Sequence, residues 1–131
     1  MRKTPPPRPT DAELSILRVL WRRGPSTVRQ IAEELNRLQP TGYTTVLKLM
    51  QIMIEKGLLK RDDTDRSHVY EAALAEEETQ QQLIRDLLER AFAGSARKLV
   101  LQALSTKKAT REELAEIRKL IDKMERGSGC S

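Results

Sequence analysis

The chain has 131 residues, of which 33% are charged and only 3% aromatic, and its formal net charge is +5. This length allows one domain, or a small domain with a helical extension, and a core made mainly of aliphatic side chains favours an α-rich fold. The single cysteine, Cys130, excludes an intramolecular disulfide, and the lack of a long apolar run or a signal-peptide pattern predicts a cytoplasmic protein without membrane contact.

The first 40 residues contain a tail and two helix patterns. Residues 1–9 are rich in proline and arginine and predict an extended basic tail. Thr10 and Glu13 have the spacing of a capping box, and the apolar periodicity that follows predicts a helix ending at Gly24. The pair Ser26-Thr27 offers a second N-cap, and the amphipathic stretch after it fades at residues 36–40.

A third helix pattern runs over residues 41–56 and ends at Gly57, as expected of a helix C-terminus. Two short strand patterns, residues 58–61 and 67–71, then flank the charged run 62–66 and predict a β-hairpin. Three helices followed by a hairpin predict a winged helix-turn-helix DNA-binding domain over residues 10–74. The expected fold class is therefore mostly α with a small β-hairpin.

The third helix has two distinct faces. Helical geometry of 100° per residue places Val46, Leu49, Met50 and Met53 together as an inward face. The opposite side carries polar groups that could bond phosphates or base edges. These predicted DNA-binding residues are Thr44, Thr45, Lys48 and Gln51. An ordinary solvated face is the alternative, and the position of the helix before a basic hairpin favours DNA contact.

The hairpin and the tail supply further cations. Arg61 and Arg66 are predicted to contact DNA phosphates, although acidic residues in the same loop could pair with them instead. The tail arginines and Lys3 could reach a groove, but a solvated tail is the simpler interpretation. An alternative function is a winged-helix protein–protein interaction module, which the acidic Glu55 on the outer side of the third helix keeps open.

Residues 75–126 are nearly continuous helix pattern, interrupted at Gly94-Ser95 and at residues 105–110, and residues 127–131 form a flexible end. So many apolar side chains in three helices predict a dimerisation region that a second copy of the chain covers. The expected dimerisation residues are Leu83, Leu87, Leu88, Phe92, Leu99, Leu104, Leu114, Ile117, Leu120 and Ile121.

The sequence offers no sign of catalysis or of a cofactor. His68 has no neighbouring ligand at metal-binding spacing, and Cys130 lies in a Gly-Ser-Gly-Cys-Ser end without a partner. Neither a phosphate-cradling glycine loop nor a nucleophile with a matching base is present. We therefore expect a protein that is not an enzyme and binds no metal.

Seven segments together resemble the penicillinase repressor (BlaI/MecI) family of winged-helix regulators, over residues 10–124. The first helix, the third helix with its exit, the hairpin and the C-terminal helices each contribute, and their order along the chain carries the resemblance. The matching segments are residues 13–21, 43–50, 55–59, 66–70, 92–95, 99–101 and 112–121.

The resemblance implies a homodimeric repressor whose two heads bind the halves of an inverted-repeat operator in promoter DNA, controlling β-lactamase-type or other stress-response genes. Thr44, Thr45 and Lys48 would then be the readers and Arg66 a wing contact. In the best-known members a membrane sensor protease signal leads to cleavage between an Asn and a Phe. The corresponding cleavage region here is Gln102-Ala103, which departs from that pair.

Other departures from the family pattern bear on the preferred operator sequence and on the inducing signal. Ile52 stands where many members carry a basic residue, and Asp65 replaces a common wing glycine. A copper-sensing branch of the family has a C-terminal cysteine cluster, which the single Cys130 cannot supply.

Overall fold

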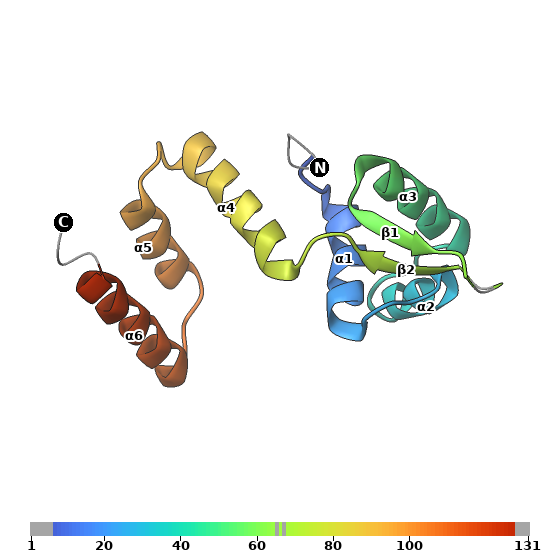
Figure 1. The fold of residues 1–131 in the computed structure, drawn as a ribbon. Coiled ribbons are helices and arrows are strands. Elements are labelled where there is room, and N and C mark those ends of the chain that lie inside the picture. Colours follow the sequence, from blue (N-terminus) through green and yellow to red (C-terminus); the bar gives the residue numbers. More distant parts are fainter. Residues whose placement is uncertain (1–6, 65, 67, 128–131) are drawn as a thin grey trace. The chain divides into compact units, whose positions relative to one another are not determined.

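The computed structural model describes residues 7–64, 66 and 68–127 (Figure 1). The chain divides into two compact units, Met1–Arg85 and Asp86–Ser131, which we call the head and the C-terminal unit. The described residues form six α-helices and one two-stranded antiparallel sheet, which confirms the predicted fold class. The bounds in chain order are α1 Asp11–Arg23, α2 Val28–Leu38, α3 Tyr43–Lys56, β1 Leu59–Asp62, β2 Val69–Ala72, α4 Glu76–Ala91, α5 Ala96–Thr106 and α6 Arg111–Gly127.

The first two helices begin with capping boxes. The Thr10 hydroxyl accepts a hydrogen bond from the Glu13 amide at 3.2 Å, and the Glu13 carboxylate accepts one from the Thr10 amide at 2.9 Å. Thr27 and Gln30 repeat this arrangement at the start of α2, where the sequence had indicated only an N-cap. Both helices therefore start where local side chains satisfy the first free amides.

Helix α3 begins at Tyr43, two residues after the predicted start at Thr41. The Thr41 amide donates to the Asn36 side chain at 2.6 Å and its hydroxyl donates to the Gln39 carbonyl at 2.9 Å, so this residue belongs to the turn. The helix ends as predicted at Gly57, which has a φ of +83°. Glycine adopts this left-handed conformation without the steric cost that a Cβ atom imposes.

The hairpin follows α3 directly. Strands β1 and β2 pair with Leu59 opposite Ala72 and Asp62 opposite Val69, so residues 63–68 connect them and the second strand starts two residues later than predicted. Backbone hydrogen bonds of 2.8 and 2.9 Å between Ser26 and Tyr70 join the hairpin to the segment before α2. Main-chain hydrogen bonds thus attach this hairpin, residues 59–72, which we call the wing, to the helical part of the head.

The core of the head is aliphatic and lies where α1, α2, α3 and the hairpin meet. Its fully buried members include Ile16, Leu17, Ile31, Val46, Met50 and Met53. The predicted inward face of α3 is confirmed, with Leu49 packed at the core edge. The Trp21 indole donates a hydrogen bond to the Leu74 carbonyl at 3.0 Å, and Thr79 in α4 is buried.

The head continues to Arg85 and so includes the first part of α4. The helix break predicted at Gly94-Ser95 is confirmed and spans residues 92–95, and the one predicted at 105–110 is shorter, because α5 continues to Thr106. Thr110 and Glu113 form the second predicted capping box through bonds of 2.8 and 3.0 Å. None of the described helices is both long and apolar enough to cross a membrane.

Candidate nucleic-acid interface

The outer face of α3 is a polar strip. Thr44, Thr45, Lys48 and Gln51 are all exposed, whereas Val46, Met50 and Met53 on the other side of the helix have no exposed surface. The core thus holds one side of the helix, and the predicted readers remain accessible on the opposite side. Lys48 makes no hydrogen bond or ion pair within the described residues, so its ammonium is available to an anionic partner.

The N-terminus of α3 presents free backbone amides. Its N-cap is Gly42, and no side chain caps the helix there, unlike at α1 and α2. Free amides and the positive end of the helix dipole favour a phosphate at such a position. Tyr43, whose side chain is 50% exposed at the same end, was not among the predicted readers. Its place in the first helical turn, directly before Thr44, is the sequence signal that could have identified it.

In the connection between the two strands, Asp63 has two close side-chain partners. Arg61 Nε lies 2.7 Å from Asp63 Oδ1, and His68 Nδ1 lies 2.7 Å from the same oxygen. Hydrogen bonding to Tyr70 and then to Asp63 raises the pKa of Arg61 further above its already high value. The structure therefore assigns Arg61 an intramolecular partner, the alternative left open by the sequence.

Arg66 differs from Arg61 in this respect. It is exposed and forms no ion pair with the other residues that the structure describes. Arg29 on α2 is likewise exposed and unpaired within that part of the chain, and sequence reasoning did not select it. Free cations of the head within the described residues thus include Arg29 on α2, Lys48 on α3 and Arg66 in the connection between the strands.

The C-terminal unit exposes large apolar side chains. No described residue of α5 or α6 is buried. Of the predicted dimerisation residues, Leu87, Leu104, Leu120 and Ile121 are exposed, and the other six are half-buried. Exposed large apolar residues of α4, α5 and α6 outside that set are Ile84, Val100, Leu101 and Met124. So many exposed large apolar side chains are unusual for a surface that stays in water, and they favour an interaction site.

The Gln102-Ala103 pair lies inside α5 and both residues are exposed. The Gln102 carbonyl accepts a hydrogen bond from the Thr106 hydroxyl at 2.6 Å, and the Ala103 carbonyl accepts one from the Lys107 amide at 3.3 Å. Proteases bind their substrates in extended form, so cleavage at this bond requires α5 to open locally.

No cluster of three His, Cys, Asp or Glu side chains suited to a metal ion occurs among the described residues. Arg2, Lys3 and Cys130 lie outside the residues that the structure describes. The exposed face of α3 and the wing remain the features that define a candidate site.

The head has three helices, a polar outer strip on the third helix, and a hairpin whose second strand pairs with Ser26 before α2. This arrangement defines a winged helix-turn-helix protein. Comparison with solved structures agrees. The solution structure of the DNA-binding domain of the repressor BlaI has a TM-score of 0.51 and 24% identity, covering 57% of this chain and 92% of that one. The Bacillus licheniformis BlaI monomeric form in complex with the blaP half-operator has a TM-score of 0.50 and 24% identity, covering 56% and 90%.

The family model described as penicillinase repressor matches residues 9–123. The chain therefore belongs to the penicillinase repressor family, whose members are transcriptional repressors. It is 29% identical to the transcriptional regulator BlaI of Mycobacterium tuberculosis over 91% of this chain and 86% of that protein. It is 23% identical to the penicillinase repressor of Bacillus licheniformis over 88% and 91%.

Proposed function

We propose that this repressor is a homodimer that binds an inverted-repeat operator and inserts the outer face of α3 into the major groove of each half-site. The observation that carries the proposal is that Thr44, Thr45 and Lys48 are exposed on α3, while the opposite face of this helix is buried in the core. A structure of similar fold was solved in complex with a half-operator, which supports operator DNA as the partner.

Each polar group has a distinct chemical role in this proposal. The Lys48 ammonium would donate to a guanine edge or to a phosphate, and the threonine hydroxyls would bond base edges while their methyl groups meet thymine methyls. Gln51 would add an amide one turn further along α3. The free amides at Tyr43 and the unpaired Arg66 would hold the backbone on either side of the groove.

A second head would add its own contacts to those of the first. We infer that residues 75–126 pair two chains through the exposed apolar surface of the C-terminal unit. Pairing raises the effective concentration of the second head once the first is bound, so the dimer binds far more tightly than either head. Occlusion of a promoter by this complex would produce repression without catalysis. The repressor would act in the cytoplasm, where promoter DNA is located.

Proteolytic release remains a proposal that the family resemblance suggests. A sensor protease that cut at Gln102-Ala103 would act on an α-helix, so it would need a partly opened form of α5. Cleavage there would divide the C-terminal unit and thereby separate the two heads from each other.

The test of DNA reading is Lys48→Ala, with Lys119→Ala as its matched control. Lys119 is an exposed lysine on α6 without an ion pair among the described residues. A mobility shift on a genomic DNA fragment selected by the wild-type protein should show that Lys48→Ala costs about 1–3 kcal/mol if the side chain reads a base, or flattens the salt dependence by about one unit if it contacts phosphate.

The control variant should bind as the wild type does. Equal affinity and equal salt dependence for wild type and Lys48→Ala would refute the assignment of α3 as the reading helix. A wild-type protein that retains no DNA fragment at moderate salt would instead favour the protein-interaction module.

A further inference from the structure

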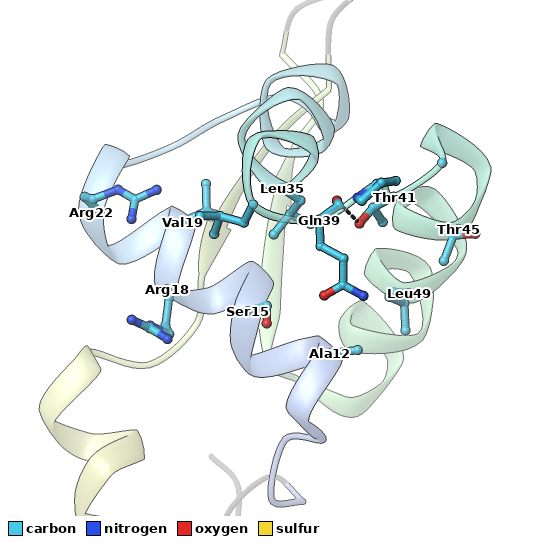
Figure 2. Close-up of a pocket in the computed structure, with 13 residues that line it drawn as sticks. Ala12, Ser15, Arg18, Val19, Arg22, Leu35, Gln39, Thr41, Thr45 and Leu49 are labelled. Carbon is cyan, nitrogen blue, oxygen red and sulfur yellow. Dashed lines mark hydrogen bonds between the residues drawn. The ribbon is translucent and has the colours of Figure 1, made fainter.

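A groove of about 460 Å³ lies beside the candidate DNA-reading strip. It is bounded by α1, by the C-terminal end of α2 with the following turn, and by the first half of α3 (Figure 2). Its volume is in the range of pockets that hold small organic ligands. All of its lining residues belong to the head.

The groove combines an apolar surface with positive charge. Val19, Leu35, Leu38 and Leu49 supply the apolar part, and Arg18 and Arg22 supply two guanidinium groups from successive turns of α1. No acidic side chain lines it. A neutral or cationic ligand would leave the Arg18 charge without a partner, whereas Arg22 is already paired with Glu34.

The positive charge of the arginines beside the groove exceeds the negative charge that the described residues place next to them. Arg22, Arg23 and Arg37 all share the single carboxylate of Glu34, at 3.1, 3.6 and 3.3 Å. Arg18 has no hydrogen bond or ion pair with any described residue. Three guanidinium groups on one carboxylate, together with the free Arg18, leave a net positive region at one side of the groove.

A polar group also projects into the groove. Figure 2 shows the Gln39 side chain extending between α1 and α3, toward Ser15 and Leu49. Its amide has no hydrogen-bond partner among the residues that the structure describes, so it can both donate to and accept from a bound molecule.

We propose that this groove is an effector site for a small amphipathic anion, an apolar ring system that carries a carboxylate. The apolar body would lie against Leu35, Leu38 and Leu49, and the carboxylate would pair with Arg18. The unpartnered cation and the apolar surface within one groove carry this inference.

The site has a direct connection to the reading helix, and this part of the inference rests on the proposed function. Thr45 lines the groove and also belongs to the outer strip of α3, and the turn 39–42 that precedes α3 forms another wall. A ligand in contact with these residues should alter the position of Thr45 and thereby lower operator affinity.

The experiment uses the full-length chain and the probe naphthoate, with the neutral naphthamide as its matched compound. Amide nitrogen–proton correlation NMR should show saturable shifts at residues 12–22 and 38–49. Arg18→Gln should weaken naphthoate binding about tenfold, because a charge-assisted hydrogen bond is lost. Ser15→Phe, which fills the groove from an exposed position on α1, should abolish binding.

Arg97→Gln is the control, because this exposed arginine of α5 lies in the other unit. Shifts confined to residues 96–124, equal binding of naphthoate and naphthamide, or no saturable binding would overturn the site. Loss of operator affinity in Arg18→Gln without any naphthoate binding would make the groove part of the DNA contact and would overturn it too.

A mobility shift with added naphthoate then tests the effector role. Operator affinity should fall as the groove fills, and an unchanged affinity at saturating naphthoate would refute that role. Failure of the proposed function gives a different result, namely no operator binding even in the absence of naphthoate.

Discussion

The buried ion pair between α1 and α3 leads to a prediction about stability. Glu13 is 2% exposed, and its two carboxylate oxygens lie 2.8 and 3.0 Å from Lys56 Nζ at the end of α3. Lys56→Met removes the partner and leaves a buried carboxylate, which should cost about 3–5 kcal/mol. Glu13→Gln leaves Lys56 access to water and should cost only about 1–2 kcal/mol.

The same pair predicts a dependence on pH. Burial raises the pKa of Glu13, but hydrogen bonds from Lys56 and Thr10 outweigh it, so the pKa lies below its usual value. This stabilisation is therefore complete above the unfolded-state pKa of about 4.3 and is lost as the pH falls through the folded-state pKa. In Lys56→Met, burial acts without the ammonium, so the stability deficit should shrink as acid protonates Glu13.

Urea unfolding at a fixed protein concentration measures these differences. Trp21 is the single tryptophan and lies in the head, so its fluorescence reports the unfolding of that unit. The free energies of unfolding of wild type, Lys56→Met, Glu13→Gln and the double variant are compared at neutral pH and near pH 4. An equal cost for both single variants, with no pH dependence of the difference, would refute the reasoning.

Three further predictions concern the dimer surface, the wing and the end of α3. Leu120→Asp should make the protein elute as a monomer in size-exclusion chromatography and weaken operator binding at least about tenfold. The control Leu38→Asp, at an exposed position of the head, should keep the dimer elution volume. A Leu120→Asp variant that still elutes as a dimer would contradict the proposed interface. Asp63→Asn should remove the ion-pair partner of Arg61, which keeps its hydrogen bond to Tyr70, and should steepen the salt dependence of operator binding by about one unit; an unchanged slope would show that Arg61 does not face DNA. Gly57→Ala should lower the free energy of unfolding by about 1 kcal/mol in thermal denaturation, and a gain would disprove the left-handed C-cap.

Local signals in the sequence predicted most of the secondary structure. The capping pair of Thr10 and Glu13, the pair of Thr110 and Glu113, and the glycine at 57 each fix a helix end through contacts within a few residues. The inward face of α3 followed from its periodicity alone. These features depend on neighbours along the chain, which a sequence displays directly.

Features that depend on distant residues could not be predicted. Glu13 was identified as a capping residue, but its pairing with Lys56, 43 positions away, depends on how α1 packs on α3. The sequence likewise left open whether Arg61 pairs with an acidic neighbour, because the backbone of the wing connection decides which carboxylate it reaches. The groove beside α3 involves three separate segments and has no local signature.

The lack of buried residues in α5 and α6 has a consequence for how the amount of repressor is set. Helices without a core of their own are prone to open, and an open chain is a substrate for cellular proteases. Pairing would therefore protect each copy from degradation, so scarce repressor would be turned over faster than abundant repressor. Both the lifetime of the chain and its dimerisation would then rise with its concentration. A given increase in the rate of repressor synthesis would therefore produce a more than proportional increase in promoter occupancy.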